Sequence, residues 1–163
     1  MPELPPRAQI VQEHLARSGC DAMIRVLPGS TRTAADAARE LGCPVGAIAS
    51  SLVFLAGGTP LLVMTSGRHR VDTLFLADRL GIGRVERASA EQVRAVTGQA
   101  IGGVAPLGHP RPISTVVDAS LSEFDPLWSA AGTPHAVFPV SFTDLVRMTS
   151  GRVLPVTTES TAG

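Results

Sequence analysis

Two runs of sequence rich in Val, Leu and Ile, residues 48–55 and 60–65, are separated by only the four residues Ala-Gly-Gly-Thr. Large apolar and β-branched residues favour strands, and a Gly-Gly pair supplies the positive φ angles that a two-residue hairpin turn requires. This segment is the strongest hairpin signal in the chain. It predicts an antiparallel pair of strands.

Short predicted helices and strands alternate along the rest of the chain, without a regular βαβ repeat. Helices are expected over residues 7–18, 33–41, 71–80, 89–96 and 141–149, several of them closed by glycine. Further strands are expected over residues 22–27, 84–87, 113–117, 127–131, 136–140 and 152–156. Asp118 follows one of these strands and is expected to cap a short helical turn.

This order of elements predicts an α+β (mixed α/β) fold, in which short helices flank a curved, largely antiparallel mixed sheet. The chain has 163 residues, 44% hydrophobic and 17% charged, which suits one compact domain over residues 1–163. Residues 1–27 would form its N-terminal helix and strand, and residues 157–163 a frayed tail.

The charge composition limits the partners that the chain can attract. Its formal net charge is zero, so no global field draws it to nucleic acid or to a membrane, and no DNA partner is expected. All 14 basic residues are arginines. The absence of Lys excludes Schiff-base chemistry and a Walker-type phosphate lysine. An anionic partner must therefore be held by a local arginine patch.

The cysteines and histidines form no metal or redox motif in the sequence. Cys20 and Cys43 lack C-x-x-C spacing, and the four histidines are scattered. No metal and no cofactor are expected. The start of the chain has no basic and apolar leader, and no apolar run approaches the roughly 20 residues that span a bilayer. These features predict a cytoplasmic protein without a membrane partner.

The densest cluster of turn-forming residues is T-G-Q-A-I-G-G-V-A-P-L-G-H-P, residues 97–110. Its glycines allow close approach of backbone to a ligand, and its prolines fix the shape of the loop. Such a loop suits a site that reads a small ligand by shape. The common phosphate-binding and serine-hydrolase motifs, G-x-x-x-x-G-K-[ST] and G-x-S-x-G, do not occur.

Three further residues have two readings each. Arg68 and Arg70 lie between a hairpin strand and a helix start, which suits phosphate, although solvated surface arginines would look the same. His135 follows A-A-G-T-P, where it could lie at a pocket rim or simply face water.

The order of several short motifs resembles the YbaK/ProX family of aminoacyl-tRNA editing domains. They are T-A-A-D-A-A-R-E-L-G (33–42), I-A-S-S-L-V-F (48–54), R-V-D (70–72), T-G-x-x-I-G-G-V-A-P-L-G (97–108), V-V-D (116–118) and A-G (131–132). The match covers residues 28–150. These proteins are freestanding relatives of the editing domain inserted in bacterial prolyl-tRNA synthetases.

The resemblance implies hydrolysis, without metal, of the ester that joins a wrong amino acid to tRNA. The family's G-x-x-x-P loop, which holds the aminoacyl end, corresponds to Gly102 through Pro106, and His135 matches a pocket histidine of some relatives. Such a loop can position a water and stabilise an oxyanion with fixed N–H donors.

The chain departs from the family at one strand position. Many members carry Lys in an I-x-K-[ST]-L-x-F strand, where this chain has Ser50 followed by Ser51. A hydroxyl can form hydrogen bonds but supplies no positive charge. Either Arg68 or Arg70 replaces the charge, or the substrate differs, or the protein binds without hydrolysing.

The leading hypothesis is a deacylase that acts in trans on a small amino acid attached to tRNA(Pro) or a similar tRNA. Its partners would be the aminoacyl-tRNA 3′ end and an aminoacyl-tRNA synthetase. The expected catalytic residues are Gly102, Gly103, Ser50 and His135. The expected substrate-binding residues are Pro106, Thr97, Gly98, Arg68, Arg70, Ser51 and Gly132. The alternative is a non-catalytic module that binds an aminoacyl-nucleotide or another small ligand.

Overall fold

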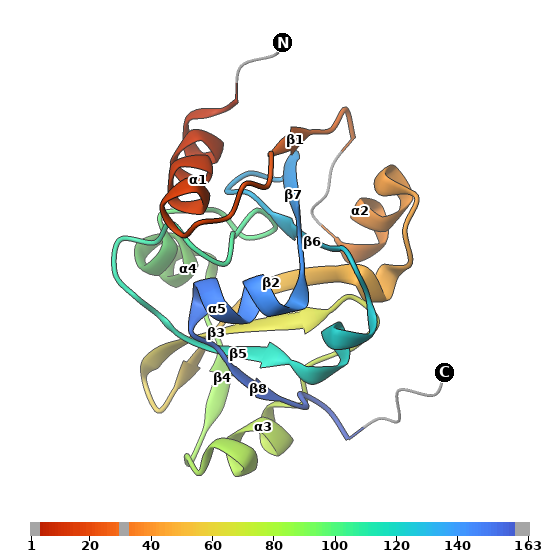
Figure 1. Cartoon of the computed structure of the whole chain (residues 1–163). Helices are drawn as coiled ribbons and strands as arrows, with labels where there is room; N and C mark the ends of the chain where they lie inside the picture. The colour runs from red at the N-terminus through yellow and green to blue at the C-terminus, as the bar shows by residue number, and fades with distance from the viewer. Residues whose placement is uncertain (1–3, 30–32, 159–163) are drawn as a thin grey trace.

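A mixed sheet runs through the centre of the molecule in the computed structural model, which describes residues 4–29 and 33–158 (Figure 1). Within these residues the sheet has eight strands, ordered β1-β7-β6-β2-β3-β5-β8, with β4 also paired to β2. The strands are β1 (Arg25–Val26), β2 (Ile48–Ala56), β3 (Thr59–Ser66), β4 (Val85–Arg87), β5 (Ser114–Asp118), β6 (Leu127–Ala130), β7 (Ala136–Val140) and β8 (Arg152–Leu154). The α-helices are α1 (Pro6–Arg17), α2 (Ala34–Leu41), α3 (Thr73–Leu80), α4 (Ala90–Thr97) and α5 (Phe142–Thr149).

The predicted hairpin is confirmed as the pair β2 and β3. Gly57 and Gly58 have φ angles of 58° and 89°, the left-handed conformation that the tight turn needs. Pro60 faces Leu55 across the pair. In an antiparallel ladder, hydrogen-bonded pairs alternate with pairs that are not hydrogen-bonded. The N–H of Gly67 donates to the C=O of Ile48, so residues 48 and 67 form a hydrogen-bonded pair and residues 55 and 60 do not. The ladder therefore needs no N–H from Pro60.

The sheet mixes both strand directions, as the sequence predicts. Among the pairings of the described residues, β1–β7, β2–β3, β2–β4 and β6–β7 are antiparallel. β2–β6, β3–β5 and β5–β8 are parallel. The parallel pairs bring β5 beside β3, and so place the end of the 113–117 segment next to the end of the hairpin.

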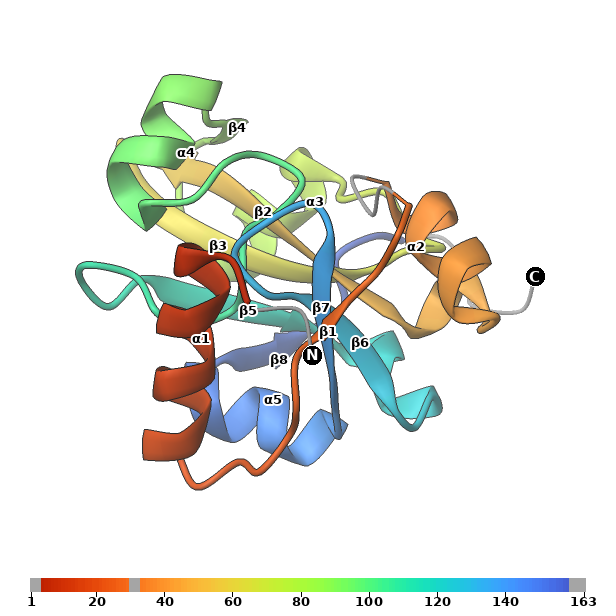
Figure 2. The same ribbon diagram turned by 90° about the horizontal axis from the view of Figure 1, so that it is seen from above.

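Helices cover both faces of the sheet (Figure 2). The larger core cluster joins α1, α4 and α5 to one face, through residues such as Leu15, Met64 and Leu145. A second cluster joins α3 to the other face around Phe54 and Leu76. A third packs α2 against Ile48 where β2 meets β6. These layers hold β2 and β3 rigidly, and the candidate site is built on them.

Three predicted elements differ from the observed ones by more than one residue at an end, and one of them, the strand expected over 152–156, ends at Leu154 as β8. The strand expected over 22–27 is reduced to β1, because only Arg25 and Val26 pair with β7. The helix expected from residue 71 begins at Thr73, because the carboxylate of Asp72 caps it by accepting from the N–H of Phe75 at 3.1 Å. The predicted turn after Asp118 is confirmed as a short 3-10 helix, Ala119–Glu123.

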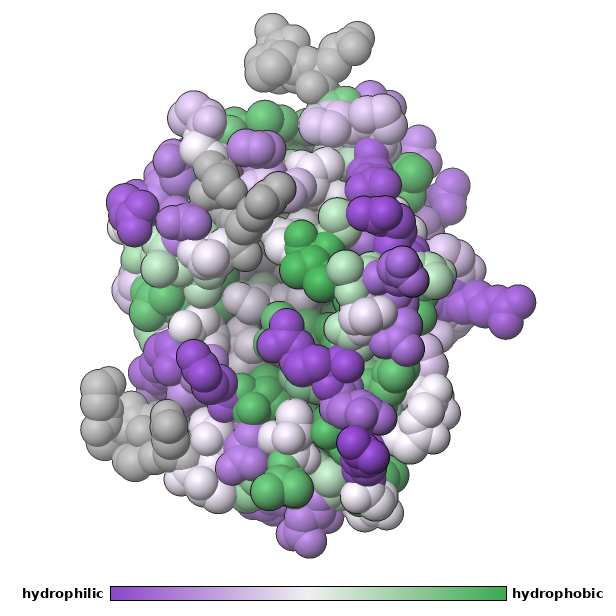
Figure 3. All heavy atoms as spheres, turned by 180° about the vertical axis from the view of Figure 1, so that it is seen from behind, coloured by the Kyte–Doolittle hydropathy of each residue, from purple (hydrophilic) through white to green (hydrophobic). Residues whose placement is uncertain are grey.

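Hydrophilic and hydrophobic side chains are interspersed on the face opposite to that of Figure 1 (Figure 3). Among the described helices, none has the length and apolar character needed to cross a membrane. Residues 159–163 of the predicted frayed tail lie outside the described residues.

Candidate functional site

A cavity of about 320 Å³ opens beside the middle of β2. Its walls come from β2, the end of β3, β6, the start of α2, and the residues around Arg87 and Gly102. Ser50, Ser51 and Gly102 all line it, so the fold brings the middle of β2 and the glycine-rich loop to one place. These segments are about fifty positions apart in the sequence.

The cavity coincides with a gap in the pairing of β2. On the edge away from β3, β2 pairs with β6 only at Ile48 and Ala49, and with β4 only from Phe54 onward. The N–H of Gly67 donates to the C=O of Ile48, and the backbone groups of alternate residues of β2 point to the same side. The N–H and C=O of Ser50 therefore point to β3, and those of Ser51 point to the gap. Ser51 therefore offers a backbone donor and acceptor at the cavity.

Three polar side chains form a row across β2, β3 and β5. Ser50 lies opposite Thr65, and directly paired residues share one face of a sheet. Asp118 lies one step beyond the Met64–Val117 pair and so stands beside Thr65. The Thr65 hydroxyl donates to Oδ2 of Asp118 at 3.4 Å. The row thus places Ser50 on the same face of the sheet as a buried carboxylate, with Thr65 between them.

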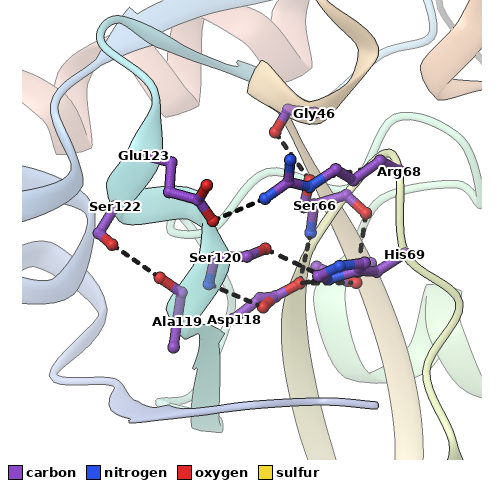
Figure 4. Close-up of polar contacts among 10 residues, drawn as sticks. Gly46, Ser66, Arg68, His69, Asp118, Ala119, Ser120, Ser122 and Glu123 are labelled. Atoms are coloured by element: carbon purple, nitrogen blue, oxygen red, sulfur yellow. Dashed lines mark hydrogen bonds and ion pairs between the residues drawn. The ribbon is translucent and has the colours of Figure 1, made fainter. Parts of the chain in front are cut away.

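Asp118 is the centre of a hydrogen-bond network (Figure 4). Its Oδ2 accepts from the N–H of Ser66 at 3.0 Å, and its Oδ1 accepts from the N–H of Ser120 at 3.0 Å. Nδ1 of His69 lies 3.0 Å from Oδ2 and 3.2 Å from the Ser120 hydroxyl. The His69 side chain is 6% exposed and that of Asp118 is 1% exposed. His69 also lines the cavity.

The loop of residues 97–110 packs partly into the main core, and Gly102 is its glycine on the cavity lining. The Thr97 hydroxyl donates to the C=O of Val93, and the side chain of Gln99 accepts from the N–H of Ala105 at 2.7 Å. Gly98 ends α4 in the left-handed conformation, and Pro106 is buried. Thr97 and Gly98 line a separate hollow with His14 and His109.

Gly103 and Gly132 permit close packing of backbone. A Cβ on Gly103 would lie 2.6 Å from the carbonyl carbon of Thr133, and one on Gly132 would lie 3.0 Å from the C=O of Arg7. Neither glycine is on the cavity lining. These two residues bring the loop, the 131–135 turn and α1 together.

Arg68, Arg70 and His135 are not among the residues that line the cavity. Arg68 pairs with Glu123 at 2.6 Å and lies over the ring of Phe124, and Arg70 is exposed. His135 is exposed, and its Nδ1 lies 3.1 Å from the C=O of Gly29. The cation on the lining, among the described residues, is Arg87, whose guanidinium lies 5.7 Å from the ring centroid of Phe54.

Sequence reasoning did not single out His69 or Arg87, and it assigned Asp118 only a capping role. The cap is real, since Asp118 accepts from the N–H of Ser120. Two features of the sequence could have pointed to a site at these residues. His69 lies next to R-V-D, and Asp118 lies at the end of a buried strand. These features become usable only once β5 is known to lie beside β3.

Comparisons with known proteins show the family to which the chain belongs. A family model described as an aminoacyl-tRNA editing domain matches residues 29–148. The proline–tRNA ligase of Latilactobacillus sakei is 29% identical over 99 residues, which are 61% of this chain and 17% of the ligase, so the chain spans only a small part of that enzyme. The uncharacterised protein YwhH of Bacillus subtilis is 24% identical over 144 residues, which are 88% of this chain and 91% of YwhH.

Solved structures extend the likeness over nearly the whole chain. A protein described as a candidate trans-editing enzyme for prolyl tRNA synthetase has a TM-score of 0.89 and 36% identity, covering 96% of this chain and 100% of its own. The family model covers well over half of the residues. This chain belongs to the aminoacyl-tRNA editing domain family.

Proposed function

We propose that this protein hydrolyses, in trans, the ester that joins a small, wrongly attached amino acid to tRNA(Pro) or a similar tRNA. The observation that carries the proposal is the cavity at which Ser50 of β2 and Gly102 of the loop meet, in a chain of this family. Its partners in this proposal are the aminoacyl-tRNA 3′ end and a prolyl-tRNA synthetase.

The aminoacyl end binds between the open edge of β2 and the loop. The backbone of Ser51 and of Gly102 gives fixed dipoles that can hold the ester and stabilise the oxyanion as it forms. Ser50 adds a hydroxyl on the same strand. Arg87, at the cavity, can pair with a phosphate of the terminal nucleotide, since guanidinium groups suit phosphate geometry.

Deacylation of mischarged tRNA tests the proposal directly. Purified protein is incubated with tRNA(Pro) carrying Ala, Cys or Ser, and with correctly charged Pro-tRNA(Pro), and the release of amino acid is followed. We expect turnover of at least one mischarged tRNA and sparing of Pro-tRNA(Pro). Binding without turnover on every member would support a non-catalytic binding module instead.

Gly102→Ala tests the role of the loop. Gly102 has φ of 90° and lines the cavity, so we expect the deacylation rate to fall by roughly 100-fold as the bound ester is displaced. Gly108→Ala is the matched control. Gly108 belongs to the same loop and has φ of 84°, but it is not on the cavity lining, and a Cβ there meets Val11 only at 3.6 Å. Equal losses in both variants would mean that backbone strain, not the cavity, causes the effect.

A further inference from the structure

The carboxylate of Asp118 fixes how the proton is placed on His69. Asp118 accepts from the N–H groups of Ser66 and Ser120 and from the Thr65 hydroxyl. A carboxylate with these donors is an acceptor toward the Nδ1 of His69, 3.0 Å away, so Nδ1 carries the proton. The Ser120 hydroxyl, 3.2 Å from the same nitrogen, can accept from it as well.

The other ring nitrogen is then free to act as a base. Nε2 of His69 has no hydrogen-bond partner among the described residues, and the residue lines the same cavity as Ser50 and Gly102. With Nδ1 protonated, the neutral ring presents its lone pair at Nε2. An imidazole held by a buried carboxylate in this tautomer is the arrangement by which hydrolases orient a general base.

We propose that His69 is the catalytic base of the hydrolysis and that Asp118 is its positioning residue, an inference that rests on the function proposed above. Nε2 takes a proton from a water whose oxygen attacks the ester carbonyl carbon. The tetrahedral intermediate collapses with cleavage of the bond to the ribose oxygen, which receives the proton from the imidazolium. The products are the free amino acid and the tRNA with its terminal hydroxyl restored.

The charged groups around the ring are consistent with this role. Asp118 faces it from the end of β5. The adjacent Arg68 is paired with Glu123, and Arg87 stands on the cavity lining at β4. An imidazolium formed during the reaction is therefore stabilised by Asp118.

His69→Asn separates the base from its structural role. The Asn amide can replace Nδ1 as a donor to Asp118, but it has no group in the place of Nε2. We expect kcat for the preferred mischarged tRNA to fall by roughly 100-fold or more, with little change in KM or in melting temperature. His14→Asn is the control, because His14 lies on α1 and lines another hollow. A kcat within about threefold of wild type, too small a change for the loss of a general base, would overturn the inference.

The pH dependence gives a second readout that does not need a variant to fold. After subtraction of uncatalysed hydrolysis at each pH, the wild-type rate should fall on acidification, because a protonated base cannot accept the proton of the attacking water. A flat wild-type profile contradicts a histidine base. In His69→Asn this fall should disappear, and Asp118→Asn, which disturbs the tautomer, should lower kcat more than it changes KM. If the wild-type protein deacylates no mischarged tRNA, the proposed function itself fails; if it is active and His69→Asn is equally active, only the assignment of His69 fails.

Discussion

At Gly103, a single added methyl group would meet three backbone atoms at close range. A Cβ there would lie 2.6 Å from the carbonyl carbon and 2.8 Å from the Cα of Thr133, and 2.9 Å from the N of Pro134. Backbone atoms cannot rotate away as a flexible side chain can. The glycine therefore keeps the G-x-x-x-P loop against the 131–135 turn, and it does so between Gly102 and Val104, which line the cavity.

Gly103→Ala should lower the free energy of unfolding by about 1–3 kcal/mol, because the added methyl group overpacks this contact. Urea denaturation monitored by circular dichroism measures the change. Gly83→Ala is the control, since a Cβ there meets nothing within 4 Å, and it should stay within about 0.5 kcal/mol of wild type. Equal stabilities for Gly103→Ala and wild type would show that the two segments can move apart freely.

At the scale of the elements, the interrupted pairing of β2 distinguishes this sheet. β6 and β4 each bind one end of the strand and leave Ser51 between them. An open edge inside a sheet would be costly in an apolar core, because backbone groups need partners. Here the cavity borders the gap, so solvent or a ligand can supply those partners.

Amide hydrogen exchange tests the open edge. We expect the N–H of Ser51 to exchange faster than those of Ser50 and Leu52, which face β3 in the ladder. A non-hydrolysable aminoacyl-adenosine analogue, if it binds here, should slow exchange at Ser51 more than at its neighbours. Uniform protection along 50–52 without ligand would show that the edge is already paired.

At the scale of the whole molecule, α1 and the loop of residues 97–110 meet at a hollow lined by a half-buried histidine, His109. Nε2 of His109 donates to the C=O of Ala105 at 2.8 Å, which holds the loop, and α1 contributes His14 and Arg7 to the same hollow. Burial lowers the pKa of His109 and nearby His14 lowers it further, while the hydrogen bond to Ala105 opposes them. The folded protein therefore favours neutral His109.

Stability should consequently fall as the medium is acidified. Because the pKa of His109 is lower in the folded chain than in the unfolded chain, the unfolded state binds more protons between those two values, and stability rises with pH there. On acidification the loss begins near the ordinary histidine pKa of about 6.5 and is complete below the folded value. Thermal unfolding from pH 8 to 5 measures it. His109→Gln should lessen the dependence relative to wild type, and an unchanged curve in that variant would contradict the assignment.

Local signals account for the elements that the sequence predicts well. The Gly57-Gly58 turn and the Ser89–Gln92 capping box each depend on residues within a few positions of one another, and both are present in the structure. The family resemblance predicted that the β2 strand and the glycine-rich loop contribute to one site, which local patterns alone could not show. Neither the local patterns nor the resemblance could decide whether Arg68 or Arg70 lines the cavity, because position in the sequence does not determine which side chain reaches it.

The sequence by itself determined the order of helices and strands, the hairpin, the caps and the family, because these depend on short-range backbone preferences and on the order of motifs. Only the tertiary structure decided which side chains share the cavity. His69 and Asp118 are 49 positions apart, and they meet because β5 pairs in parallel with β3. Strand pairing between distant segments depends on how apolar faces of many elements pack together, which no local pattern records.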